Sequence, residues 1–131
     1  MSKRMSKKLT SQWSLKKPLH LEKKDKRYAR HVKQLKKHGF SDSETWSLDS
    51  VIAEFILPRL KRFKEVHNGF PGGGDMTEQK WEEILDKMIF AFEFHSLKYD
   101  WSADKPGFDA EYAKYEEGLQ LFAKWFGDLW W

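Results

Sequence analysis

The chain has 131 residues, no cysteine and 34% charged residues, a composition that indicates one small globular domain and excludes disulfides, zinc–cysteine sites and thiol catalysis. Its net charge of +4 conceals an asymmetry: residues 1–40 carry 14 Lys/Arg against two acidic residues, whereas residues 41–131 carry 10 against 18. Such a basic segment contacts either a polyanion or an acidic protein surface, its own included.

The first part of the chain is predicted to be a basic arm followed by a helix. Residues 1–17 are polar and show no period, so we expect them to be disordered. Residues 18–131 are predicted to form a single α-helical domain. Its first helix is expected from Glu22 to His38, where Gly39 provides a left-handed stop.

The second predicted helix runs from residue 48 to about residue 67. Either Ser43 or Ser47 can cap it, because a serine hydroxyl accepts a hydrogen bond from a first-turn amide. Pro58 falls inside the pattern, which predicts a kink or a break. The stripe expected to be buried consists of Ile52, Phe55, Ile56, Leu60 and Phe63.

The segment "NGFPGGG" (68–74) is the clearest predicted loop. A phosphate cradle is disfavoured, because no strand precedes it, no Gly-Lys-Ser/Thr follows, and Asp75 stands where an anion would bind. We interpret it as a flexible turn. Thr77 is expected to cap a helix from residue 78 to about residue 97, with Met76 and Trp81 as a hydrophobic staple. Two apolar stripes predict a central helix: Trp81, Ile84, Leu85, Met88, Phe92 and His95, and then Phe90, Phe94 and Leu97.

The last predicted helix covers residues 110–126, with Asp109 as its cap and Gly127 as its end. Trp130 and Trp131 are expected to pack on the body or on another subunit. No segment alternates as a strand does. The predicted fold is therefore all-α, a compact bundle of three to four principal helices with a basic, partly disordered N-terminal arm.

A group of cations, Arg59, Lys61, Arg62 and Lys64, is the candidate anion site outside the basic arm. Arginine can bind phosphate through two parallel hydrogen bonds, and an aromatic ring can stack on a base. The alternative is a solvated helix face. The candidate ligand-binding residues are Arg59, Arg62, Lys64, Trp81, His95, Tyr99 and Trp101.

No catalytic residue, metal ligand or cofactor is predicted. Glu82 and Glu83 flank an apolar stripe and are expected to face water, unlike the inward carboxylates of a magnesium site. No apolar run approaches the roughly 20 residues of a membrane span. The N-terminus also lacks the apolar stretch of a signal peptide. A cytoplasmic protein without a membrane partner is therefore expected.

The stretches "FILPRLKRFKE" (55–65) and "EILDKMIFAFE" (83–93) are the most specific parts of a resemblance that covers about residues 40–126. Over this region the sequence resembles a group of small tailed-bacteriophage proteins with no established activity. The resemblance implies a phage origin and carries no catalytic residue. Small accessory phage proteins often act on host defence systems by binding.

The leading functional hypothesis is a non-enzymatic, homo-oligomeric phage protein that captures an anionic nucleotide-like ligand, such as a host immune signal. A second hypothesis is a direct inhibitor or adaptor that binds a host protein through its acidic body and the Trp-Trp terminus. A third is nucleic-acid binding through residues 1–40, with an affinity that falls steeply as salt rises.

Overall fold

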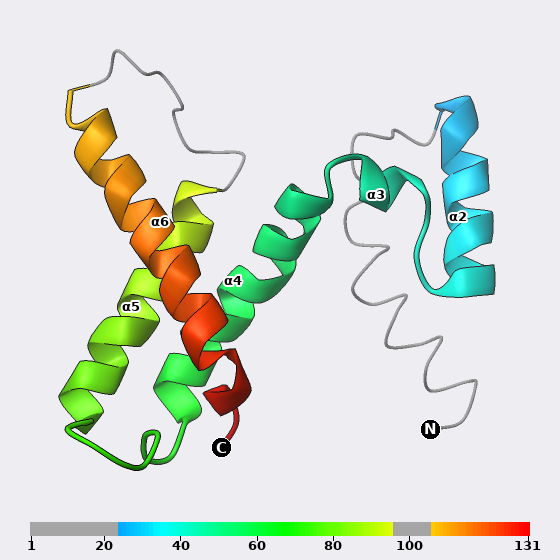
Figure 1. Ribbon diagram of the computed structural model, residues 1–131. Coiled ribbons are helices and arrows are strands. Elements are labelled where there is room, and N and C mark those ends of the chain that lie inside the picture. Colours follow the sequence, from blue (N-terminus) through cyan, green and yellow to red (C-terminus); the bar gives the residue numbers. More distant parts are fainter. Residues whose placement is uncertain (1–23, 96–105) are drawn as a thin grey trace. The chain divides into compact units, whose positions relative to one another are not determined.

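The computed structural model is all-α, as predicted (Figure 1). It describes residues 24–95 and 106–131, and no strand occurs in these two ranges. The helices are α2 (Lys26–His38), α3 (Ser43–Trp46), α4 (Leu48–Val66), α5 (Glu78–Phe94), α6 (Phe108–Trp125) and the 3₁₀ helix η1 (Phe126–Asp128). Across the described ranges, no helix is both long and apolar enough to cross a membrane.

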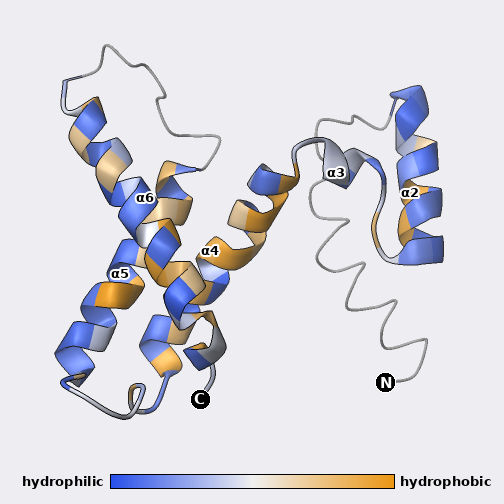
Figure 2. Cartoon of the chain, in the orientation of Figure 1, coloured by the Kyte–Doolittle hydropathy of each residue, from blue (hydrophilic) through white to orange (hydrophobic). Residues whose placement is uncertain are grey.

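The chain divides into two compact units, Met1–Val51 and Ile52–Trp131. The division falls within α4, so that helix contributes to both. The boundary predicted after residue 17 lies outside the described residues. Figure 2 shows that hydrophilic residues cover most of α2, whereas apolar residues run along α4 and α5.

The first unit is built around α2, whose two ends are set by local signals. Asp25 stands at the N-cap, and its side chain accepts a hydrogen bond from the Arg27 amide. Gly39 has φ 84° at the other end, and its amide donates to the Leu35 carbonyl. The predicted stop at Gly39 is confirmed. The helix begins at Lys26 rather than Glu22, because the Asp25 cap fixes its first turn.

The second unit has α5 at its centre, as its two apolar stripes predicted. One face of α5 contributes Trp81, Leu85, Met88 and Phe92 to a cluster that includes Leu60 of α4. The other face contributes Ala91 and Phe94 to a cluster with Tyr115 of α6. Leu97, placed in the second stripe, lies outside the described residues. Two buried faces make α5 the element on which α4 and α6 both pack.

The glycine segment forms the predicted loop between α4 and α5. Gly69, Gly73 and Gly74 all have positive φ values, 77°, 86° and 65°, which favour glycine over every other residue. The loop ends at Thr77, whose hydroxyl accepts a hydrogen bond from the Lys80 amide at 3.1 Å. This cap is confirmed, and α5 starts immediately after it.

The prediction for the buried stripe of α4 was partly wrong. Ile52 and Phe55 are 49% and 38% exposed, whereas Ala53 and Leu60 are each 2% exposed. The helix is turned so that the Ala53 and Leu60 side faces α5. Pro58 causes no break, because it lies on an exposed face of α4, where water can solvate the carbonyl that loses its partner.

The ends of α6 also differ from the prediction. Gly107, with φ 80°, occupies the N-cap position, and Asp109 lies in the first turn, where its charge still favours the helix dipole. Beyond α6 the chain continues as η1 through Gly127. The expected packing of the terminal indoles on the body is not observed, since Trp130 and Trp131 are 76% and 65% exposed; their packing on another subunit stays a prediction.

The closest helix contact of the second unit lies between α5 and α6. A Cβ atom added at Gly118 would lie 2.2 Å from the Lys87 carbonyl oxygen and 2.6 Å from the Ala91 Cβ. The missing side chain at this position therefore sets the separation of the two helices. In Figure 1, α6 crosses α5.

Candidate functional site

The candidate anion site on α4 is largely neutralised by carboxylates of the protein itself. The Lys64 ammonium lies 2.7 Å from the Asp86 carboxylate, and the Lys61 ammonium lies 2.9 Å from that of Glu93. Arg62 pairs with Glu65 at 2.9 Å, one turn along the same helix. Three of the four cations of this group therefore already have an anionic partner.

Lys64 is the best held of these cations. Its side chain is 33% exposed, the lowest value of any partner in these ion pairs. The hydrogen bond to Asp86 raises the pKa of Lys64 above its ordinary value. Lys64 thus joins α4 to α5, and a phosphate would have to displace a carboxylate to reach it.

Arg59 is held by its own helix. Its guanidinium donates to the Phe55 carbonyl at 2.8 Å and lies 3.9 Å from the centre of the Phe55 ring. Arginine side chains on helix surfaces often cover exposed aromatic rings. Of the three predicted phosphate ligands, Arg59 alone makes no ion pair within the described residues.

The predicted stacking residues are not brought together around these cations. Trp81 is 1% exposed, and its indole packs edge-on against Trp125, so it belongs to the core. The His95 imidazole is half-buried, stacks on Tyr115 and lies 2.8 Å from its hydroxyl through Nδ1. Tyr99 and Trp101 lie outside the described residues.

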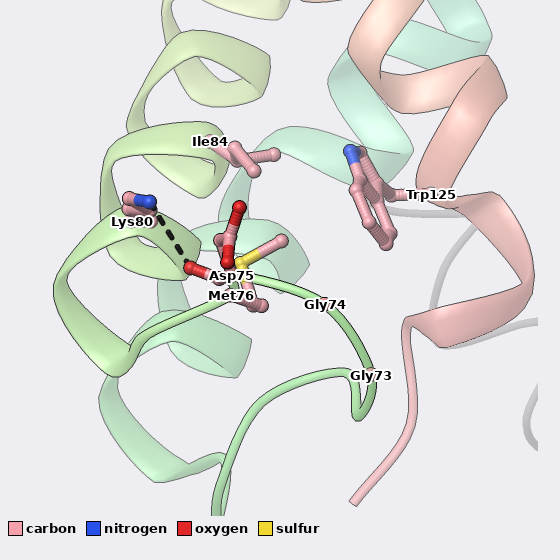
Figure 3. A pocket seen from close by; sticks show the side chains of 7 residues that line it. All are labelled: Gly73, Gly74, Asp75, Met76, Lys80, Ile84 and Trp125. Atoms are coloured by element: carbon pink, nitrogen blue, oxygen red, sulfur yellow. Dashed lines mark hydrogen bonds between the residues drawn. The ribbon is translucent and has the colours of Figure 1, made fainter.

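A shallow cavity of about 360 Å³ lies beside the glycine loop (Figure 3). It is lined by residues 73–76, by Lys80 and Ile84 of α5, and by Trp125 of α6. The Lys80 ammonium already donates to the Asp75 carbonyl at 3.0 Å. The exposed Asp75 carboxylate would repel a phosphate, and the enclosed Trp125 Nε1 is not presented to the cavity surface. The cavity therefore agrees with the interpretation of this segment as a turn rather than a phosphate cradle.

The first unit carries a second group of cations with a different arrangement. Lys26, Arg30, Lys33 and Lys37 are all exposed and follow each other at spacings of four, three and four residues. This spacing places them on one side of α2, opposite His31 and Leu35, which are 2% and 6% exposed. We call these four residues the α2 stripe.

The α2 stripe differs from the α4 cations in its pairing. No carboxylate of the described residues lies at ion-pair distance from Lys26, Lys33 or Lys37. Arg30 lies 3.5 Å from Asp42 and is the one member of the α2 stripe with a carboxylate partner in the part of the chain that the structure describes. A lysine in the last turn of a helix interacts favourably with the helix dipole. This interaction explains the presence of Lys37, but not that of the members of the stripe nearer the start of α2.

A hydrogen-bonded cluster fixes the turn that follows α2. His31 Nδ1 is in hydrogen-bond contact with the Ser41 hydroxyl and lies 2.8 Å from the Ser43 hydroxyl. The Glu44 carboxylate accepts from the Ser41 amide at 2.7 Å. This hydrogen bond ties Glu44, in the first turn of α3, back to the backbone of Ser41 just before the helix.

This cluster was not predicted from the sequence. The Ser-x-x-Glu spacing of residues 41–44 was the available signal, whereas the contact with His31 joins residues ten positions apart and has no local signature. The sequence prediction included Arg30 and the α2 lysines only within the basic segment 1–40 that was expected to bind nucleic acid. Once the start of the helix is known, the spacing of these residues predicts that they lie on one side of it.

Two exposed aromatic residues lie in the same unit. Phe40 is 52% exposed and Trp46 is 80% exposed. Phe40 directly follows Gly39 at the end of α2, and its ring centre lies 6.4 Å from that of His38. The first unit thus presents both cations and aromatic rings at its surface.

Among the described residues, no group of three or more His, Asp and Glu side chains could hold a metal ion. No protein-family model matches the chain, and neither a curated protein nor a solved structure matches it. The candidate function therefore depends on the chemistry of the α2 stripe and of the α4 cations.

Proposed function

We propose that the protein is a non-enzymatic binding protein that contacts nucleic acid through the α2 stripe. The observation that carries this proposal is the contrast between two cationic surfaces. The lysines of the α2 stripe have no carboxylate partner among the described residues, whereas Lys61, Arg62 and Lys64 are paired. A cation without an internal partner is available to an external anion.

The length of the stripe favours a linear polyanion over a small ligand. Lys26 and Lys37 are eleven residues apart on one helix, a distance of about 16 Å. Duplex DNA carries about one negative charge per 1.7 Å of its axis, so several phosphates lie within reach. A single nucleotide concentrates its phosphates at one point and can engage only one end of the stripe.

The capture of a nucleotide-like ligand by Arg59, Arg62 and Lys64 stays a prediction with less support. Its phosphate would compete with the Glu65 and Asp86 carboxylates, which are already in place. Calorimetry against cyclic and linear nucleotides distinguishes the two ideas. Heat of binding that Arg62→Ala abolishes would favour the nucleotide site over the α2 stripe.

The resemblance to tailed-bacteriophage proteins supports a setting in an infected bacterial cell. There, a binding protein can mask or sequester nucleic acid that a host system would otherwise use, which fits an accessory counter-defence role. Binding to a host protein through the exposed Trp130 and Trp131 is an alternative supported by their exposure alone.

The test is fluorescence anisotropy of the full chain with labelled 20-nucleotide DNA and RNA at salt concentrations from about 50 to 200 mM. We expect binding to weaken steeply as salt rises. The double variant Lys33→Ala/Lys37→Ala should lower the slope of log K against log salt by about 1.5, because each lost phosphate contact removes close to one released cation.

The matched control is Lys114→Ala/Lys124→Ala, which removes the same charge from exposed lysines of α6. We expect this variant to bind as the unmodified chain does. Equal losses for both double variants, or binding that ignores salt, would overturn the proposal that the α2 stripe is the binding surface.

A further inference from the structure

We propose that the surface formed by α2 and the turn after it selects single-stranded over duplex nucleic acid. This inference rests on the proposed function and adds the form of nucleic acid that is bound. It is carried by Phe40, an exposed ring placed at the end of a helix that bears the α2 stripe.

Phe40 follows the cationic last turn of α2 in the chain. The last turn of α2 holds Lys36, Lys37 and His38, two residues or more before Phe40 in the chain. The ring is 52% exposed although α2, which ends two residues before it, has buried positions at His31 and Leu35. A large apolar ring held in water beside several cations has the chemistry that binds an unpaired base next to its phosphate.

The backbone on both sides of Phe40 is held by the turn. Gly39 adopts φ 84°, and Ser41 is 0% exposed, with its amide bonded to Glu44. Gln34 and Asp42 exchange two hydrogen bonds of 2.9 Å each, which tie the turn back to α2. Phe40 therefore projects from a backbone that is fixed before any ligand arrives, and less conformational entropy is lost on binding.

The preference for a single strand follows from the access that an aromatic ring has to the bases. In a duplex the bases are stacked on each other, and the backbone is the part presented to a convex helix surface. In a single strand each base can leave the stack and cover an aromatic side chain, which contributes favourable free energy for every base stacked. Trp46, 80% exposed in the same unit, adds a second ring of this kind.

The experiment compares a 20-nucleotide single strand with the duplex of the same sequence, using the full chain and anisotropy at one salt concentration. We expect the single strand to bind at least tenfold more tightly. Phe40→Ala should weaken single-strand binding about fivefold or more and leave duplex binding unchanged, because only the single strand offers a base to stack. Phe40→Trp should restore it.

Phe70→Ala is the matched control, since Phe70 is 46% exposed but lies in the glycine loop of the second unit. Circular dichroism of each variant reports whether α2 is still folded. Equal affinity for the two forms, with Phe40→Ala without effect on either, would overturn the inference and leave the proposed function standing. Failure to bind either form would remove the proposed function itself.

Discussion

At the scale of single residues, Gly118 shows how one missing side chain determines a helix contact. The nearest neighbours of a Cβ at this position are the Lys87 carbonyl and the Ala91 Cβ, and a backbone carbonyl cannot swing aside as a long side chain can. A glycine inside a helix is disfavoured by about 1 kcal/mol relative to alanine. The close contact therefore outweighs helix propensity here.

We expect Gly118→Ala to lower the free energy of unfolding by about 1–3 kcal/mol, the usual range for overpacking. Thermal unfolding followed by circular dichroism measures the change. Gly127→Ala is the control, because no atom lies within 4 Å of a Cβ at that position. An increase in stability for Gly118→Ala would contradict this account. It would show that the gain in helix propensity exceeds the cost of overpacking, because α5 and α6 can move apart.

Residue-level signals explain much of what the sequence could predict. The Gly39 stop and the Thr77 cap depend on chemistry within one turn, and both were found where expected. The pairing of Lys64 with Asp86 joins residues 22 positions apart, and no local pattern reveals it. For this reason the α4 cations were predicted as an anion site although carboxylates of α5 lie beside them.

At the scale of elements, α2 depends on its N-cap because few of its residues are buried. The Asp25 carboxylate accepts from the Arg27 amide at 2.8 Å and from two guanidinium nitrogens of Arg27 at 3.1 and 2.8 Å. The guanidinium hydrogen bonds, followed by the backbone hydrogen bond, lower the pKa of Asp25 from 3.8 to about 2. The charged carboxylate is thus the form that stabilises the helix.

The pH dependence of α2 follows from this shift. Because the folded-state pKa of Asp25 lies below its ordinary value, its contribution is complete above pH 3.8 and is lost as the pH falls through about 2. Carboxyl carbon NMR should show Asp25 titrating near that lower value. Asp25→Ala should reduce the helicity of α2 at neutral pH, as judged from Cα chemical shifts, while Asp25→Asn should retain part of it, because its amide oxygen can still accept from the Arg27 amide. An Asp25 carboxyl that titrates at its ordinary value would contradict this account.

The orientation of α4 shows what element-level reasoning could not supply. The sequence predicted a helix of the right length, 48–67, against the observed Leu48–Val66. It assigned Ile52 and Phe55 to the core because they fall at helical spacing with Leu60. Several apolar stripes fit this helix equally well, and the choice depends on how α5 packs against it, which only the tertiary structure contains.

At the scale of the whole molecule, the two units have unequal cores. Among the described residues, the buried apolar side chains of Met1–Val51 are Leu35 and Val51. The corresponding residues of Ile52–Trp131 are Ala53, Leu60, Trp81, Leu85, Met88, Ala91, Phe92, Phe94 and Tyr115. Since apolar burial supplies most of the stabilising free energy, we expect the second unit to be the more stable.

Hydrogen exchange followed by mass spectrometry tests this difference. Amides of α5 should exchange slowly and at a rate set by global unfolding, whereas those of α2 should exchange through local opening. Saturating single-stranded DNA should slow exchange in α2 selectively. Equal protection of α2 and α5 in the free protein would show that the hydrogen-bonded cluster around His31 stabilises the first unit as strongly as a full apolar core.

The unequal exposure of the indoles has an optical consequence. Trp81, enclosed in the second unit, should emit at shorter wavelength and be protected from acrylamide, whereas Trp46 and Trp130 are open to collisions with the quencher. Fluorescence from the buried indole reports whether the interior is intact. Fluorescence from the exposed indoles reports contact at the surface. The intrinsic tryptophan fluorescence of the unlabelled protein can therefore distinguish a nucleic-acid strand that binds the folded protein from one that unfolds it.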